Sequence, residues 1–326
     1  MKTNILILSA GRRVALIKAF KNALKKLGDG GNIISADISM LAPSFYVSDK
    51  YYVIPKLDSI EFIPSLIEII KKEEIKAVIP TIDLDLPVLA KNKERIEKET
   101  GTKVIISNEK AIEICSDKKK THDFFIENNI PCPKLFQKSD FISYPLLIKP
   151  AKGFAAVGIS KVNNKEELSI LSEKIENPLL QEFVKGKEHT IDLFSDFEGN
   201  VISIVPRKRL EIRGGEVVKG VTVYNKEIIE LSKNIAEKLN FIGPITLQCF
   251  LNEDGLKFFE INPRFGGGAP LSIKSGANSP EWIIKLLRGE KLEIKIGQFE
   301  RNLFMLRYDD AIFIKGIKNE FTWREE

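Results

Sequence analysis

Apolar and polar positions alternate along residues 1 to about 110 in a pattern that predicts a parallel α/β domain. Residues 5–8 are a continuous apolar run, which is typical of a strand buried on both faces. Residues 12–27 follow with apolar side chains at helical spacing, among them Phe20 and Leu24. The alternation continues with expected strands at 33–37, 51–54, 77–80 and 104–106, and expected helices at 60–70 and 86–96. Such an order implies right-handed crossovers between parallel strands.

The remainder of the chain predicts mainly antiparallel strands. A helix opens at Asp117, a strand ends at Lys149, and a loop of small residues at 153–158 precedes the next strand. Further expected elements are helices at 165–175, 228–239 and 280–287, and strands at 178–182, 190–194, 201–205, 217–223, 245–251 and 256–262. The last two strands, joined by the turn 252–255, form a hairpin.

The second strand of that hairpin ends in a set of polar residues. Because side chains two apart share one face of a strand, Glu260 and Asn262 are expected on one face, with Phe259 and Ile261 opposite. Their oxygens suit a hard cation, and Arg264 adds a fixed positive charge beside it. A metal and a guanidinium together suggest a phosphate-bearing substrate. The alternative is a strand end facing solvent, followed by an ordinary Asn-Pro turn.

Two lysines offer charge for a phosphate. Lys118 stands at a helix start, where a cation opposes the helix dipole unless an anion is near; a solvated charged face is the alternative. Lys149 precedes the small-residue loop, whose backbone amides can approach a phosphate, although most such loops are hairpins. The lysine precedes the loop and no helix follows it, so this is not a P-loop.

Composition narrows the class of protein. A chain of 326 residues with 43% hydrophobic content suits two or three globular domains. The net charge of +5 fits an anionic small molecule and does not require nucleic acid. The three cysteines have no CxxC spacing, which favours a reducing cytoplasm. With only two histidines, most histidine-based catalytic triads are excluded. No apolar run is long enough to cross a membrane.

The N-terminal domain shows a weaker signal. Its first turn, at 9–13, lacks the three-glycine fingerprint of a dinucleotide site. Thr81, Asp83 and Asp85 follow a strand end directly, where open α/β sheets place ligands. Helix capping by Thr81 or Asp83 explains the same residues equally well.

Taken in order, these segments resemble the ATP-grasp superfamily. The resemblance rests on Lys118 at a helix start, Lys149 before a small-residue loop, the Glu-Phe-Val and Gly-Lys-Glu segments within 182–188, and Glu-Ile-Asn-Pro-Arg at 260–264. It is nearest to the carbamoyl-phosphate synthetase large-chain and biotin carboxylase branch. It implies a mixed α/β and α+β fold with three domains: a parallel α/β (pre-ATP-grasp) domain at 1–110, a small lobe or lid at 111–187, and a C-terminal lobe with the metal site at 188–326.

The resemblance also implies ATP and Mg²⁺ as cofactors, with Mn²⁺ as a substitute. The residues it assigns to ATP are Lys118 and Lys149 for the phosphates, Gly153, Ala155 and Gly158 for a loop closing over them, Glu182, Phe183 and Val184 for adenine, and Glu188 for the ribose. Gln248, Glu260 and Asn262 would carry the magnesium ions. Arg264 would stabilise the transferred phosphoryl group or the acyl phosphate, and Lys149 would assist as the second catalytic residue.

The implied activity is ATP-dependent ligation of a carboxylate to an amine through an acyl phosphate, with release of ADP and phosphate. The loop has alanines at 155 and 156 where biotin carboxylase has more glycine, and the chain shows one ATP-grasp unit, about half a synthetase large chain. A stand-alone carboxylate–amine ligase therefore fits better than a complete synthetase or carboxylase. The alternatives are an enzyme forming carbamoyl or carboxy phosphate and a non-catalytic ATP-binding subunit.

The substrates are expected to be a small-molecule carboxylate and an amine of unspecified identity. Arg209, Arg213 and Lys219 cluster near one strand connection and are predicted to hold the acid, near Gly267. A solvated basic hairpin is the alternative for these three residues. A homodimer is compatible with this assignment.

Overall fold

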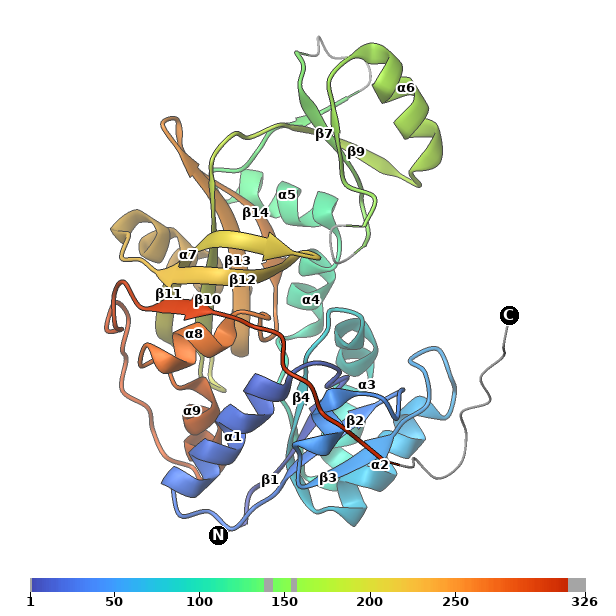
Figure 1. Ribbon diagram of the computed structural model, residues 1–326, viewed down its shortest axis with the longest axis vertical. Helices are drawn as coiled ribbons and strands as arrows, with labels where there is room; N and C mark the ends of the chain where they lie inside the picture. Colours follow the sequence, from blue (N-terminus) through green and yellow to red (C-terminus); the bar gives the residue numbers. More distant parts are fainter. Residues whose placement is uncertain (1, 138–142, 154–156, 316–326) are drawn as a thin grey trace.

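The computed structural model describes residues 2–137, 143–153 and 157–315, and these residues form three sheets. In Figure 1 the N-terminal domain lies at one end of the molecule, a six-stranded sheet lies in the middle, and a small lobe stands at the opposite end. The mixed α/β and α+β fold expected from the sequence is confirmed. The domain limits at residues 110 and 187 stay predictions.

The N-terminal sheet is parallel, with strand order β3-β2-β1-β4-β5. Its strands are β1 (Asn4–Leu8), β2 (Ile33–Asp37), β3 (Lys50–Val53), β4 (Ile75–Pro80) and β5 (Lys103–Val104). Its helices are α1 (Val14–Lys26), α2 (Phe62–Lys72), α3 (Asp85–Thr100) and the short 3-10 helix η1 (Pro43–Tyr46). All strands and helices expected in this part of the sequence are present.

The central strand β1 shows why this sheet is buried on both faces. Ile5 and Ile7 join the apolar core that contains α1, while Leu6 and Leu8 join the core under α2 and α3. Alternate side chains thus enter opposite cores, so an unbroken apolar run is required.

The small lobe contains a four-stranded sheet of order β6-β9-β7-β8. Its strands are β6 (Leu135–Phe136), β7 (Leu146–Pro150), β8 (Ser160–Val162) and β9 (Pro178–Glu182), and α6 (Lys165–Lys174) packs on them. Helices α4 (Glu109–Cys115) and α5 (Lys118–Glu127) connect it to the N-terminal domain. Asp117 caps α5 by accepting hydrogen bonds from the backbone amides of Lys119 and Lys120.

The six-stranded sheet has order β14-β13-β10-β11-β12-β15 and is antiparallel. Its strands are β10 (Lys187–Ser195), β11 (Val201–Arg213), β12 (Glu216–Thr222), β13 (Gly243–Asn252), β14 (Gly255–Asn262) and β15 (Phe304–Leu306). Helices α7 (Lys226–Leu239), α8 (Ala269–Lys274) and α9 (Ser279–Leu287) complete this part. The sequence pattern did not predict α4, α8 or β15, which are short.

The two faces of the six-stranded sheet differ. One face, with Ile191, Leu247 and Phe258, packs on α5 and α7. The other face packs on α1, α8 and α9 near Phe194 and Val205, and it carries polar side chains farther along the same strands. The N-terminal domain therefore covers only part of this face.

A β-bulge corrects one expectation about β14. Gln248 pairs with Glu260, but Cys249 pairs with Phe258, so Phe259 is the extra residue. Phe258 is fully buried, whereas Phe259 stacks on Phe250, which lies two residues from Gln248. The expectation that Phe259 lies opposite Glu260 is wrong, because a bulge breaks the two-residue period.

Charged contacts fasten the N-terminal domain to α9. Asp29, whose side chain has no exposed surface, accepts hydrogen bonds from the Thr3 backbone and hydroxyl, from the Gly31 amide and from Arg288 at 2.7 Å. Burial alone would raise the pKa of Asp29, but the hydrogen bonds from Thr3, Arg288 and Gly31 lower it to about 2.

This contact predicts a pH-dependent loss of stability in Asp29→Asn. Because the pKa is lower in the folded state, ionised Asp29 adds about 2 kcal/mol to the free energy of unfolding. This contribution is present above about pH 4 and is lost as the pH falls through about 2. Chemical denaturation at several pH values measures the difference from the unsubstituted chain, with exposed Asp58→Asn as the control. A cost that is the same at pH 2 and pH 6 would contradict this account.

Candidate functional site

The polar half of the uncovered sheet face carries a connected row of side chains. Gln248 donates a hydrogen bond to Glu188 at 2.9 Å, and Asn262 donates to Gln248 at 3.3 Å. Arg209 forms an ion pair with Glu188 at the other end of the row. Strands β10, β11, β13 and β14 thus bring five of the predicted residues together, with Glu260 hydrogen-bonded to Asn262.

Two lysines reach the same region, Lys149 from the small lobe and Lys118 from the start of α5. Lys149 on β7 is 5% exposed, and burial, with repulsion from Lys118 as a second cause, lowers its pKa to about 8. Lys118 donates a hydrogen bond to the Gly153 carbonyl at 2.8 Å, and burial also lowers its pKa. The nearby Glu260 partly offsets both shifts. One buried and one half-buried ammonium group beside one carboxylate leave positive charge that an anion would neutralise.

Glu260 lies among charges from three parts of the fold. Burial raises its pKa, and the negative charge of Asp83 raises it further, while Asn262, Lys118 and Arg264 lower it. Asp83, which follows β4 in the N-terminal domain, pairs with Arg264 at 2.5 Å. The carboxyl end of the parallel sheet therefore meets the end of β14.

Unpaired donors line this face. Nε of Arg264 and Nε of Arg209 are buried, and neither has a hydrogen-bond partner among the residues that the structure describes. Because buried donors are nearly always paired, such groups indicate a missing water, ion or ligand. Both belong to side chains that the sequence analysis singled out.

The glycine loop after Arg264 is tightly held. A Cβ on Gly266 would lie 2.7 Å from the Thr246 hydroxyl, and one on Gly268 would lie 2.3 Å from Arg207. Arg207 is 1% exposed and donates two hydrogen bonds to Asp192, at 2.7 and 2.9 Å. The loop can approach the sheet this closely only because it lacks side chains.

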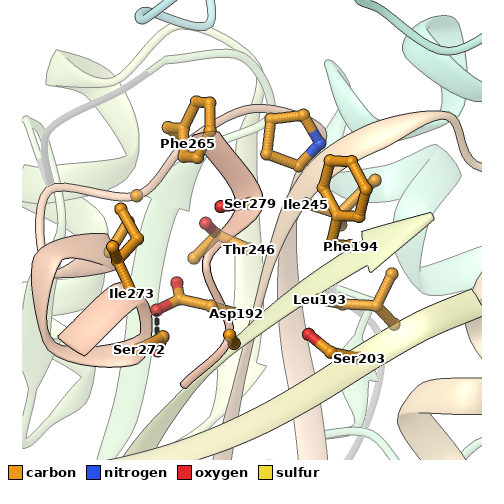
Figure 2. Close-up of a pocket in the computed structure, with 14 residues that line it drawn as sticks. Asp192, Leu193, Phe194, Ser203, Ile245, Thr246, Phe265, Ser272, Ile273 and Ser279 are labelled. Atoms are coloured by element: carbon orange, nitrogen blue, oxygen red, sulfur yellow. Dashed lines mark hydrogen bonds between the residues drawn. The ribbon is translucent and has the colours of Figure 1, made fainter. Parts of the chain in front are cut away.

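A cavity of about 20 Å³ lies beneath this loop. Figure 2 shows Asp192 and Thr246 pointing toward it, with Ser272 donating a hydrogen bond to Asp192. Its volume suits about one water molecule and is too small for a substrate. We therefore place the candidate site on the open face above it.

The segment 182–184 lies between the small lobe and the six-stranded sheet. Glu182 is paired with Lys257 and accepts a hydrogen bond from the Lys134 amide, while Phe183 lies under the Lys161 ammonium. Val184 is half-buried, and its amide has no backbone acceptor within the described ranges. An adenine base could use this free backbone donor.

Some predicted residues lie elsewhere. Arg213 pairs with Asp309 and Lys219 pairs with Glu211, all four side chains being largely exposed. Gly153 and Gly158 flank Pro150 at the base of the small-lobe loop. Ala155 lies outside the described residues. Of the three cations proposed for the acid, only Arg209 lies in the polar row.

The structure brings two further arginines close to Gly267 that the sequence pattern did not single out. Arg13, just before α1, and Arg307, just after β15, both contact Glu216 at 3.0 Å. Gly267 lies against the same group. Arg13 follows the first strand closely, and this position could have indicated a ligand-binding residue. The residues around Arg307 form no sequence pattern that singles it out.

The donor set suits a hard cation that shares its ligands with a phosphate. Glu260 supplies a carboxylate, and Gln248 and Asn262 supply amide oxygens. Within the described residues, no group of three or more His, Cys, Asp and Glu side chains could hold a metal ion. A single carboxylate with amides matches Mg²⁺, which is commonly held by one or two carboxylates together with substrate phosphates.

Two family models match the chain. Residues 5–105 match the PylC-like N-terminal domain, and residues 174–305 match the model described as ATP-grasp in the biosynthetic pathway with Ter operon. The second match indicates an ATP-grasp domain, in agreement with the fold and the site. The chain is similar to the ATP-grasp branch that includes carbamoyl-phosphate synthases, and it shares the fold of biotin carboxylases.

Curated relatives support this branch. The carbamoyl-phosphate synthase of Methanobrevibacter smithii is 28% identical over 274 residues, which cover 76% of this chain and 71% of that protein. The arginine-specific large chain of Geobacillus stearothermophilus is 24% identical over 308 residues, which cover 88% of this chain and 29% of that protein. The chain thus spans less than a third of that large chain.

Solved structures show the same fold. The biotin carboxylase domain of Hydrogenobacter thermophilus 2-oxoglutarate carboxylase, a dimer in complex with MgADP, ADP and bicarbonate, has a TM-score of 0.74 at 21% identity and covers 93% of this chain and 74% of that one. The N5-carboxyaminoimidazole synthetase of Staphylococcus aureus, complexed with ADP, has a TM-score of 0.70 at 17% identity and covers 90% and 79%.

The glycine loop yields a stability prediction. In Gly268→Ala the new methyl group would collide with Arg207, which cannot move without losing Asp192, so we expect a loss of about 1–3 kcal/mol in the free energy of unfolding. Urea denaturation measures it, and Gly30→Ala, where a Cβ would meet only Lys2 at 3.8 Å, is the control. Equal stability of the two variants would show that the loop is not tightly held.

Proposed function

We propose that this protein is an ATP- and Mg²⁺-dependent carboxylate–amine ligase. The observation that carries the proposal is the convergence of Lys118, Lys149 and Arg264 on the half-buried carboxylate of Glu260. Cations from the small lobe, from the start of α5 and from the end of β14 act on one acidic group there. This is the charge distribution that a nucleoside triphosphate with a divalent cation requires.

The polar face offers a place for each part of ATP. The free amide at Val184 suits the adenine, with Glu182 and Phe183 beside it. Glu188 would accept a hydrogen bond from the ribose after it gives up its contact with Arg209 or with Gln248. Lys118 and Lys149 would hold the phosphates, and the loop from Gly153 to Gly158, which includes Ala155, would close over them.

Gln248, Glu260 and Asn262 would hold Mg²⁺. When bound, the ion supplies positive charge to the phosphate oxygens as negative charge develops on the leaving ADP. Replacement by Mn²⁺ remains a prediction. Glu260 has a raised pKa because it is buried, and it is therefore suited to receive a cation.

The chemistry needs positioning more than it needs acid–base catalysis. A carboxylate oxygen of the acid substrate bonds to the γ-phosphorus of ATP while the bond to the β–γ bridging oxygen breaks, which releases ADP. Arg264 would hold the reacting oxygens and stabilise the negative charge on the transferred group. The amine nitrogen then attacks the acyl carbon, phosphate leaves, and the nitrogen loses its proton. Closure of the small lobe would keep water from the acyl phosphate.

A second candidate is an enzyme that forms carboxy or carbamoyl phosphate. It is favoured by the 28% identity to the Methanobrevibacter smithii synthase. It predicts bicarbonate-dependent ATP cleavage in the absence of any other carboxylic acid. A non-catalytic ATP-binding subunit is less well supported, because the chain retains Lys149, Glu260, Asn262 and Arg264.

The remaining partners follow from this proposal. Substrates would be a small carboxylate and a small amine, and neither nucleic acid nor a membrane is required. The described helices include none that is long and apolar enough to cross a membrane. A homodimer is supported by the dimeric Hydrogenobacter thermophilus domain. A cytoplasmic location stays a prediction that rests on three free thiols, Cys115, Cys132 and Cys249.

The test is a screen of acid and amine pairs for Mg²⁺-dependent release of ADP, with bicarbonate alone as a separate arm. Glu260→Gln should reduce turnover by at least about 100-fold, because it removes the charge that holds the metal. Glu253→Gln, on the exposed turn of the same hairpin, should leave turnover unchanged. Undiminished turnover in Glu260→Gln would refute the metal assignment.

The pKa of Lys149 predicts the pH dependence of nucleotide binding. The charged lysine binds phosphate, and its pKa of about 8 in the free protein means that above pH 8 binding must be accompanied by proton uptake. The affinity for MgADP should therefore fall by up to about tenfold per pH unit above pH 8. In Lys149→Arg the side chain stays charged and the curve should be flat between pH 7 and 9. Calorimetry measures both proteins, and a flat curve for the unsubstituted chain would contradict this role.

A further inference from the structure

Two arginines from opposite ends of the chain share one carboxylate. Nη1 of Arg13 lies 3.0 Å from Oε1 of Glu216, and Nη1 of Arg307 lies 3.0 Å from Oε2. Arg307 also donates to the Val217 carbonyl at 3.1 Å. The three side chains come from the N-terminal domain, the β11–β12 hairpin and the segment after β15.

Both guanidinium groups keep donors available. Apart from Nη1, none of their nitrogens has a hydrogen-bond partner among the residues described. The side chains of Arg13 and Arg307 are 19% and 31% exposed, and none of their nitrogens is among the buried atoms that lack a partner. The free edges of the two groups therefore face space that a ligand can enter.

Positive charge exceeds negative charge here. Burial lowers the pKa of Arg13, Glu216 raises it, and Arg264 and Arg307 lower it further, so Arg13 is close enough to both other arginines to be repelled by them. Glu216 and Asp83 supply two negative charges to this group of three cations. One positive charge is left over, and Arg264 is the member assigned to the transferred phosphoryl group.

The pair lies next to the reacting end of the site. A Cβ on Gly267 would lie 3.0 Å from Nη1 of Arg13 and 3.1 Å from the Glu216 carboxylate. Gly267 is three residues after Arg264 in the chain. Arg13 thus borders the glycine loop, and Arg307 is joined to the same place through Glu216.

We infer that Arg13 and Arg307 bind an anionic end group of the acid substrate, a carboxylate or a phosphate, separate from the carboxylate that becomes activated. The inference rests on the proposed ligase function and specifies the substrate class as acids with at least two anionic groups. Each guanidinium offers a planar edge with two donors, which matches the paired oxygens of such a group. Glu216 holds the two arginines in place before the substrate binds.

Two of the three cations predicted from the sequence to hold the acid are less suitable than Arg13 and Arg307. Arg213 and Lys219 are exposed and already paired with Asp309 and Glu211. Exposed pairs of this kind contribute little to binding. Arg13 and Arg307, which are partly buried next to the glycine loop, are better placed to select an acid.

The test compares matched acids that have one anionic group or two, termed mono- and dianions for short, in the protein saturated with MgADP. Glutarate is compared with butyrate, and 3-phosphoglycerate with glycerate, by calorimetry and by thermal shift. We expect at least one dianion to bind at least about tenfold more tightly than its monoanionic partner, since a charge-assisted contact of this kind is worth that much. The pair that shows the difference tells whether the end group is a carboxylate or a phosphate.

Variants connect the preference to the two arginines. Arg13→Gln and Arg307→Gln should each remove the dianion advantage, and Arg13→Lys, which keeps the charge but loses the planar edge, should reduce it. Arg12→Gln and Arg301→Gln are matched controls on exposed neighbouring arginines and should keep it. Binding of MgADP verifies that each variant is folded.

Two results would overturn the inference: equal binding of mono- and dianions by the unsubstituted protein, or a dianion advantage that survives both glutamine substitutions. These outcomes differ from a failure of the ligase proposal. Absence of MgADP binding in the unsubstituted protein would refute the ATP site itself, whereas normal MgADP binding without a dianion preference would refute only the role of Arg13 and Arg307.

Discussion

The carboxylate of Glu260 is half-buried at a point where three parts of the chain meet, and its charge acts on the groups around it. Burial disfavours the charged form, and Lys118 and Arg264 offset that cost only in part because Asp83 adds a second negative charge nearby. Burial and the neighbouring Lys118 also disfavour the charged form of Lys149, so they lower its pKa. The cluster is thus incomplete as protein alone, and a bound cation and polyanion would balance it.

The division of one sheet face into apolar and polar halves determines where this cluster can exist. Phe194 and Val205 pack against the N-terminal helix α1 and helices α8 and α9, so that half of the face is closed. Glu188 and Gln248, farther along β10 and β13, remain outside that contact and form hydrogen bonds with each other. The small lobe stands beyond this sheet at one end of the molecule, as Figure 1 shows, and its Lys149 acts on Glu260 together with Lys118 from the start of α5.

The N-terminal domain takes part in the site and does not only support it. Asp83 pairs with Arg264, and Arg13 pairs with Glu216, so two of its side chains reach the part of the six-stranded sheet that carries the candidate site. The contact of Asp29 with Arg288 fixes the same domain against α9. Because these contacts are ionic and partly buried, small shifts between the two parts would change the charge around Arg264.

Local pattern determined the parallel sheet, the hairpin of β13 and β14, and the order of lysine, acid and amide residues along the chain, because two-residue and 3.6-residue periods are properties of short segments. It misplaced Phe259, since a bulge is decided by pairing with β13. It also selected Arg213 and Lys219 for the acid, although both are paired at the surface. The sequence could not bring Arg13 and Arg307 to Glu216, because residues almost 300 positions apart meet only when separate elements pack together.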